Sequence, residues 1–88
     1  MKIDYSSTFK KAYKKRTSNH PQLKNRFKEK MALFYSNPWH PALKTHKLVG
    51  KLKNSYSFSV DYDCRIVFKF ISDDHILLID IGKHDEVY

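Results

Sequence analysis

Residues 56–71 read YSFSVDYDCRIVFKFI, and the fold follows from this stretch. Its first part, residues 56–62, alternates bulky apolar side chains with polar ones, which predicts a strand with one buried face. After a short turn, residues 64–71 form a more continuous apolar strand that Arg65 interrupts. Residues 76–81 are almost wholly apolar and suit a central strand that is covered on both faces. The C-terminal half therefore predicts three strands that follow one another in antiparallel order.

The N-terminal half shows the period of an amphipathic helix instead. A short strand over residues 2–5 precedes it, and Ser6 or Ser7 is expected to cap the first helix. Pro21 suits the first turn of a second helix, which ends where the sequence reads Ser36-Asn37-Pro38. The positions that form the two apolar faces are Phe9, Ala12, Tyr13 and Arg16, and then Leu23, Phe27, Met31 and Phe34. We expect the two helices to form an antiparallel hairpin.

These elements predict an α+β fold in which an N-terminal helical hairpin packs on one face of a small antiparallel β-sheet. The chain of 88 residues suits a single domain, residues 1–88. Residues 37–55 are predicted to be a loop that Leu43, Leu48 and Leu52 hold against the core. A loop of this length in a small domain favours a functional role.

Composition excludes several classes of protein. The single cysteine, Cys64, excludes an internal disulfide framework and a cysteine-based zinc cage. No apolar run approaches the roughly 20 residues that span a bilayer, and the first residues do not resemble a signal peptide. We therefore expect a cytoplasmic protein with no membrane partner.

Charge divides unevenly along the chain. Residues 1–53 hold 14 Lys and Arg against two acids, whereas residues 54–88 hold three against seven, within a total net charge of +8. A surface this basic attracts a polyanion, and nucleic acid is the commonest one. We interpret the basic half as a surface for nucleic acid or an acidic protein, in preference to a charged surface that only maintains solubility.

Three kinds of catalytic site find little support in the residues. No two of the five histidines have the spacing of metal ligands on a helix, so no metal is expected. Cys64 follows Asp63, a neighbour that disfavours a reactive thiolate. A glycine-rich phosphate loop is absent. The polar residues near the expected strand ends remain as candidates: His46, Asp63, Arg65, His84 and Tyr88.

Four stretches together resemble the RelE/YafQ-like superfamily of bacterial type II toxins. They are HKLVGKL at 46–52, YSFSV at 56–60, DCRIVF at 63–68 and IGKHDEVY at 81–88. The resemblance implies a RelE-like fold and a metal-independent endoribonuclease, or mRNA interferase, that needs no cofactor. It also implies a cognate antitoxin, with mRNA and the ribosome as further partners. By the same resemblance, the toxin alone is a monomer and forms a hetero-oligomer with its antitoxin.

The resemblance also assigns roles to residues. It implies His46 and His84 as acid and base, Arg65 as the clamp on the scissile phosphate, and Tyr88 as the ring that stacks on a base. Asp63 corresponds to an active-site aspartate and is expected to orient a neighbour. Residues expected to contact RNA are Lys44, Lys47, Lys51, Lys53, Ser57 and Ser59.

Two departures from the YafQ-type pattern leave alternatives open. Ser59 stands where those toxins carry a further histidine, and Cys64 replaces a tryptophan. A serine is no base at neutral pH unless it is activated. A ParE-like toxin that inhibits gyrase is one alternative, and a catalytically degenerate member that only binds antitoxin or RNA is another.

Overall fold

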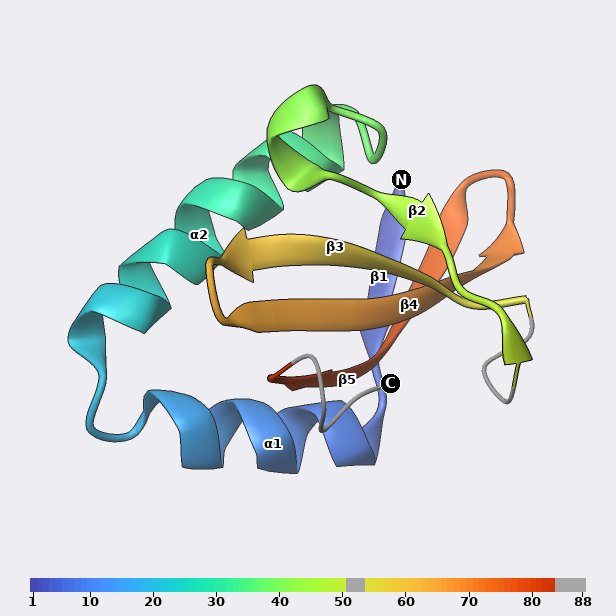
Figure 1. The fold of residues 1–88 in the computed structure, drawn as a ribbon. Coiled ribbons are helices and arrows are strands. Elements are labelled where there is room, and N and C mark those ends of the chain that lie inside the picture. Colours follow the sequence, from blue (N-terminus) through green and yellow to red (C-terminus); the bar gives the residue numbers. More distant parts are fainter. Residues whose placement is uncertain (51–53, 84–88) are drawn as a thin grey trace.

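The computed structural model describes residues 1–50 and 54–83 (Figure 1). The order of elements confirms the predicted α+β class. In chain order they are β1 (Lys2–Tyr5), α1 (Ser7–Thr17), α2 (Pro21–Ser36), the 3₁₀ helix η1 (Pro41–Leu43), β2 (His46–Lys47), β3 (Tyr56–Asp61), β4 (Cys64–Ser72) and β5 (His75–Gly82).

The five strands form one mixed sheet in the order β1-β5-β4-β3-β2. The predicted antiparallel run of β3, β4 and β5 is confirmed. The expectation of a wholly antiparallel sheet is wrong, because β1 pairs with β5 in parallel. A parallel pair needs a long crossover, and here the whole chain between β1 and β5 provides it.

Local signals at the helix ends act as expected. Ser6, rather than Ser7, is the N-cap of α1, because its Oγ accepts a hydrogen bond from the Phe9 N–H at 3.0 Å. The same hydroxyl donates to the Ile79 carbonyl at 2.7 Å, which attaches the start of α1 to β5. Pro21 begins α2, and the helix ends at Ser36, just before Asn37 and Pro38.

The two helices follow one another through a short connection, as the expected hairpin requires, but they do not run side by side. Figure 1 shows α1 and α2 diverging from their short connection, with α1 along β5 and α2 along β3. Contacts between the helices include the ring of Tyr13 against that of Phe27, with centroids 4.7 Å apart. Each helix buries its apolar face mainly against the sheet, and this arrangement separates them.

The main core lies between the helices and one face of the sheet. Phe34 of α2 is fully buried, stacks on Phe58 with ring centroids 4.5 Å apart, and meets Phe68 edge-on at 5.0 Å. A smaller apolar cluster of Leu48, Val67 and Ile79 lies on the other face of the sheet.

The predicted loop at residues 37–55 holds two short elements, η1 and β2. Leu43 and Leu48 are buried as expected, and Leu52 lies outside the described residues. Neither described helix is long and apolar enough to cross a membrane.

Candidate functional site

Polar side chains from three neighbouring strands share the face of the sheet opposite the helices. His46 of β2 pairs with Ser57 of β3, and Ser59 pairs with Arg65 of β4. Paired residues point to the same side, as do residues two apart in one strand. Phe58 points the other way, into the main core. We refer to the set of His46, Ser57, Ser59 and Arg65 as the polar face.

The polar face adjoins the smaller apolar cluster. Val67 lies two residues from Arg65 on the same side of β4, and it is packed beneath Leu48. Ser57 is fully buried, Arg65 is half-buried and His46 is exposed, with its ring Nδ1 3.1 Å from the Lys44 carbonyl oxygen. A partly buried guanidinium beside apolar groups interacts more strongly with an anion than one in open water.

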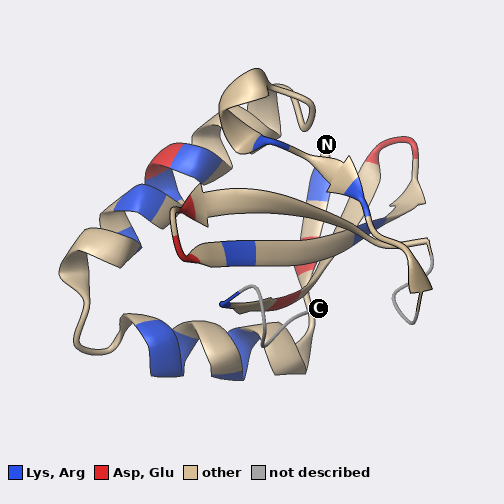
Figure 2. Ribbon diagram, in the orientation of Figure 1, with Lys and Arg blue, Asp and Glu red and all other residues tan. Residues whose placement is uncertain are grey.

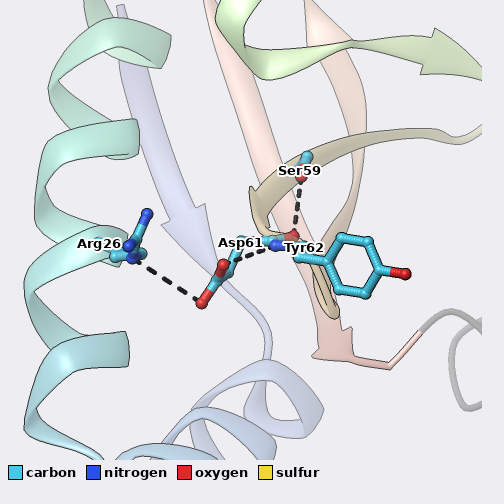
Figure 3. Close-up of polar contacts among 4 residues, drawn as sticks. All are labelled: Arg26, Ser59, Asp61 and Tyr62. Atoms are coloured by element: carbon cyan, nitrogen blue, oxygen red, sulfur yellow. Dashed lines mark hydrogen bonds and ion pairs between the residues drawn. The ribbon is translucent and has the colours of Figure 1, made fainter.

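The turn between β3 and β4 is held by Asp61 (Figure 3). The Tyr62 N–H donates to Asp61 Oδ1 at 2.6 Å, and the hydroxyl of Ser59 donates to the Asp61 carbonyl at 3.0 Å. On the other side, Asp61 Oδ2 lies 3.9 Å from Nε of Arg26 in α2. An irregular step in the strand pairing falls between Ser59 and Asp61. Asp61 therefore connects α2 with the residues that lead to Arg65.

Asp63 is exposed in this turn and lines a cavity of about 700 Å³. The cavity lies between the connection of the two helices, the β3–β4 turn and the end of β5. Cationic and acidic side chains both line it, among them Lys15, Arg16, Asp61, Asp80 and Lys83. Neither His46 nor Arg65 reaches it. Among the described candidates, the structure therefore gathers His46 and Arg65 on the polar face and leaves Asp63 in the adjoining cavity.

Cys64 lies at the base of the same cavity and is only 3% exposed. Burial raises the pKa of its thiol, and a hydrogen bond with Arg16 opposes that change. A thiol with a raised pKa holds little thiolate at neutral pH, so it is a poor nucleophile. The expectation that Cys64 is not a reactive thiolate agrees with this setting, although burial is a larger cause of the raised pKa than the neighbouring Asp63.

Of the lysines expected to bind RNA, the structure describes Lys44 and Lys47. Lys47 pairs with Tyr56 and points to the helix side of edge strand β2, away from His46. Lys44 is exposed at the end of η1, in the left-handed backbone region. Figure 2 shows further Lys and Arg residues along α1 and α2, and acidic residues in the β3–β4 and β4–β5 turns.

Four candidates fall outside the described residues, namely Lys51, Lys53, His84 and Tyr88. Among the residues that the structure describes, no group of three or more His, Cys, Asp or Glu side chains is arranged to hold a metal ion.

Two polar contacts were not foreseen from the sequence. His75 of β5 lies with its Nε2 2.7 Å from Asp4 Oδ2 of β1. Arg26 reaches Asp61 from another element. Both pairs join residues far apart in the chain, and no local sequence pattern predicts them.

Comparison with known proteins identifies the family of this chain. The family described as "Bacterial toxin of type II toxin-antitoxin system, YafQ" matches residues 1–88. No curated protein sequence matches. The crystal structure of YafQ from E. coli has a TM-score of 0.81 at 24% identity, covering 98% of this chain and 96% of that one.

Two further solved structures share the fold. The YafQ chain of the E. coli DinJ–YafQ complex has a TM-score of 0.77 at 25% identity, covering 98% of this chain and 96% of that chain. A YoeB/ParE toxin from Agrobacterium tumefaciens has a TM-score of 0.80 at 15% identity, covering 96% and 99%. These likenesses confirm the expected RelE-like fold. The chain belongs to the YafQ family of bacterial toxins of type II toxin–antitoxin systems.

Proposed function

We propose that this protein is a cytoplasmic endoribonuclease that cleaves mRNA on the ribosome and needs neither a metal nor another cofactor. Membership of the toxin family and the net charge of +8 support an RNA target. The observation that carries the proposal is the polar face, where Arg65, two serines and His46 come from three adjacent strands.

The spacing on this face suits a phosphodiester. His46 lies two strands from Arg65 and two residues along, so their Cα atoms are about 12 Å apart by ideal strand geometry. A guanidinium and an imidazole that reach inward across this distance leave room for one phosphate group between them. Arg65 can then hold the charge that develops on the phosphorane.

In the proposed reaction, the ribose 2′-oxygen attacks the adjacent phosphorus and the bond to the 5′-oxygen breaks. A base takes the proton of the 2′-hydroxyl, and an acid protonates the leaving 5′-oxygen. The products are a 2′,3′-cyclic phosphate and a 5′-hydroxyl. Histidine can fill either role near neutral pH, so His46 and His84 are assigned as the pair.

The family resemblance alone supports the roles of His84 and Tyr88, which lie outside the described residues. Tyr88 is proposed to stack on a base of the RNA. Asp63, on the edge of the adjoining cavity, is proposed to orient a neighbouring group rather than to take the proton of the nucleophile.

Ser59 favours one competing function, a toxin that binds RNA or antitoxin without cleaving. Its hydroxyl already donates to the Asp61 carbonyl, which is a structural role in the turn. A serine so engaged does not replace the histidine that YafQ-type toxins carry at this position. Cleavage therefore depends on the two remaining histidines, and a direct assay decides between the two functions.

The decisive experiment adds purified protein to ribosomes that are translating a defined mRNA and maps the fragment ends. We expect 2′,3′-cyclic phosphate and 5′-hydroxyl ends. The Arg65→Ala variant should cleave at least about a hundredfold more slowly, because an arginine that stabilises a transition-state charge contributes this much or more. The matched control is Lys69→Ala, which removes an exposed cation from the same side of the same strand.

The outcomes separate the candidate functions. Equal cleavage by the Arg65→Ala variant and the parent would exclude the phosphate clamp. Intact RNA together with DNA breaks in expressing cells would indicate a gyrase poison. Intact RNA with retained RNA binding would indicate the binding-only member of the family.

A cognate antitoxin is the second proposed partner. E. coli YafQ has been crystallised with DinJ, and a protein of that kind is proposed to bind this toxin in a hetero-oligomer. The toxin alone is proposed to be a monomer. Light scattering of the separate and mixed proteins tests both statements, and a larger particle formed by the toxin alone would contradict the second.

A further inference from the structure

Trp39 is a large aromatic side chain that the main core leaves exposed. It lies between α2 and η1, and 53% of its surface is open to solvent. Its ring stacks on Phe70 with centroids 6.2 Å apart and meets Tyr56 edge-on at 5.6 Å. Tyr56 and Phe70 contact each other at 5.3 Å. We refer to these three residues as the aromatic platform.

Hydrogen bonds hold the segment that carries Trp39 in place. The Trp39 N–H donates to Asn37 Oδ1 at 3.0 Å, and the Thr45 hydroxyl donates to the Pro38 carbonyl at 2.6 Å. Lys30 of α2 donates to the Ala42 carbonyl in η1 at 3.1 Å. A ring that is already fixed loses little conformational freedom when a ligand stacks on it.

The charge around the platform favours an anionic ligand. Lys47 lies directly opposite Tyr56 on the same side of the sheet, and Lys44 ends η1. Within residues 1–50 and 54–83, neither lysine forms an ion pair. Two acidic residues, Asp73 and Asp74, lie in the β4–β5 turn at the same end of the sheet. The Asp74 carboxylate is paired with the N-terminal ammonium at 3.3 Å.

The platform adjoins the polar face across a single edge strand. In β2, His46 points to the polar face and Lys47 points to the side of the platform. Strand β2 is the outermost strand of the sheet and has only two residues. A chain that leaves the polar face beside His46 therefore needs to pass only one strand to reach Lys47 and the platform.

We propose that the aromatic platform binds an unpaired base of single-stranded RNA that crosses the β2 edge on its way to the polar face. An exposed ring beside lysines, as Trp39 provides here, suits single-stranded nucleic acid, because every base offers a flat face for stacking. A protein partner is less favoured, since the centres of protein interfaces are poor in lysine. The inference extends the proposed function by adding a binding subsite away from the scissile phosphate.

The test uses the fluorescence of Trp39, which is the only tryptophan of the chain. The probe is a single-stranded RNA of about twelve nucleotides, within the usual range of site sizes, with 2′-O-methyl groups that prevent cleavage. We expect saturable quenching by this probe. A dinucleotide, which is too short to cross β2 from the polar face, and a duplex of the same sequence should leave the emission unchanged.

Variants then connect the signal to affinity, measured by the anisotropy of a labelled probe. Trp39→Ala should weaken binding of the long probe about tenfold, a loss within the range for one base–aromatic stack. Trp39→Phe keeps a ring and should recover most of the affinity. The matched control is Tyr35→Ala, because Tyr35 is 57% exposed on α2 and lies outside the platform. Melting curves of all variants confirm that they fold.

The results distinguish this inference from the proposed function. Quenching of Trp39 by the probe, with no cleavage of unmodified mRNA in the ribosome assay, supports the platform and contradicts the nuclease. Cleavage without quenching, or equal affinity of the alanine variants at 35 and 39, overturns the platform alone. A change in Trp39 emission on binding antitoxin, with none on adding RNA, also overturns it and assigns the rings to a protein interface.

Discussion

Removing Asp61 should weaken the turn between β3 and β4 more than removing its partner Arg26. Two contacts of the Asp61 carboxylate compete as causes of stability. One is the hydrogen bond from the Tyr62 N–H at 2.6 Å, and the other is the ion pair with Arg26 at 3.9 Å. The magnitudes of these two contacts decide the expected order of the variants.

The ion pair is long and open to water, with side-chain exposures of 58% for Arg26 and 40% for Asp61. Exposed pairs typically contribute about 0.2–1 kcal/mol, and a pair at the outer limit of distance belongs at the low end. A hydrogen bond to a charged group contributes about 1.5–3 kcal/mol. We therefore expect Arg26→Ala to cost about 0.3 kcal/mol and Asp61→Ala about 2 kcal/mol. Asp61→Asn keeps an acceptor oxygen and should fall between them.

These costs are measured by urea denaturation of the parent, the three single variants and the double variant that combines Arg26→Ala with Asp61→Ala. About 2 kcal/mol corresponds to a fall in Tm of about 8–16 °C for a domain of this size. The effect of Arg26→Ala should disappear in about 1 M salt, whereas most of the effect of Asp61→Ala should persist. If Arg26→Ala and Asp61→Ala lowered the free energy of unfolding equally, and both effects disappeared in salt, the ion pair would be the main support of the turn. That result would refute the reasoning.

Three further outcomes follow from other contacts. Ser6→Ala should lower the free energy of unfolding by about 1–2 kcal/mol in denaturant titrations, because it removes both a helix cap and a hydrogen bond to β5, while Ser7→Ala should change little. The hydrogen bond with His75 lowers the pKa of Asp4 below its ordinary value of 3.8. The contribution of ionised Asp4 to the free energy of unfolding is therefore complete above pH 3.8 and is lost as the pH falls through the lowered pKa. The difference in Tm between the parent and Asp4→Asn should therefore be present at about pH 6 and shrink as the pH is lowered below 3.8. Cys64, buried and with a raised pKa, should resist iodoacetamide in the folded protein at neutral pH and react on unfolding, as mass spectrometry would show.

Elements with a strong local period were predictable from the sequence. The second helix was expected from Pro21 to Ser36 and has those bounds. Strand β5 was expected over residues 76–81 and extends one residue further at each end. In these segments the side chains that repeat on one face are the ones that become buried, so pattern and packing agree.

Elements defined by distant partners were not predictable. Strand β2 has only two residues, too few for any period, and exists because it pairs with Tyr56 and Ser57. The direction of β1 is set by β5, some 70 residues later in the chain, which four residues of local sequence do not encode. The angle between the helices likewise depends on the sheet beneath them.

The candidate site was predictable only where it depends on the local alternation of side chains along a strand. Alternation along β3 and β4 implies that Ser57 and Ser59 share one face of their strand, and that Arg65 interrupts an apolar strand. That His46 joins the same face depends on β2, which the local sequence does not show. The position of Asp63 at the cavity depends on the β3–β4 turn, which the Asp61 carboxylate supports mainly through the Tyr62 N–H.

The two faces of the sheet have different roles, because one holds the main core and the other holds the polar groups of the candidate site. Phe34, Phe58 and Phe68 bury their rings completely on the helix side, where each buried aromatic side chain contributes several kcal/mol. This core leaves the opposite face free to hold a guanidinium and hydroxyls, groups that are costly inside a core. The small cluster of Leu48 and Val67 on that face lowers the local polarity beside Arg65. Water therefore screens the charge of Arg65 less than it screens the charges of the lysines along the helices. This difference favours the sheet face, rather than the more basic helices, as the place where a phosphate reacts.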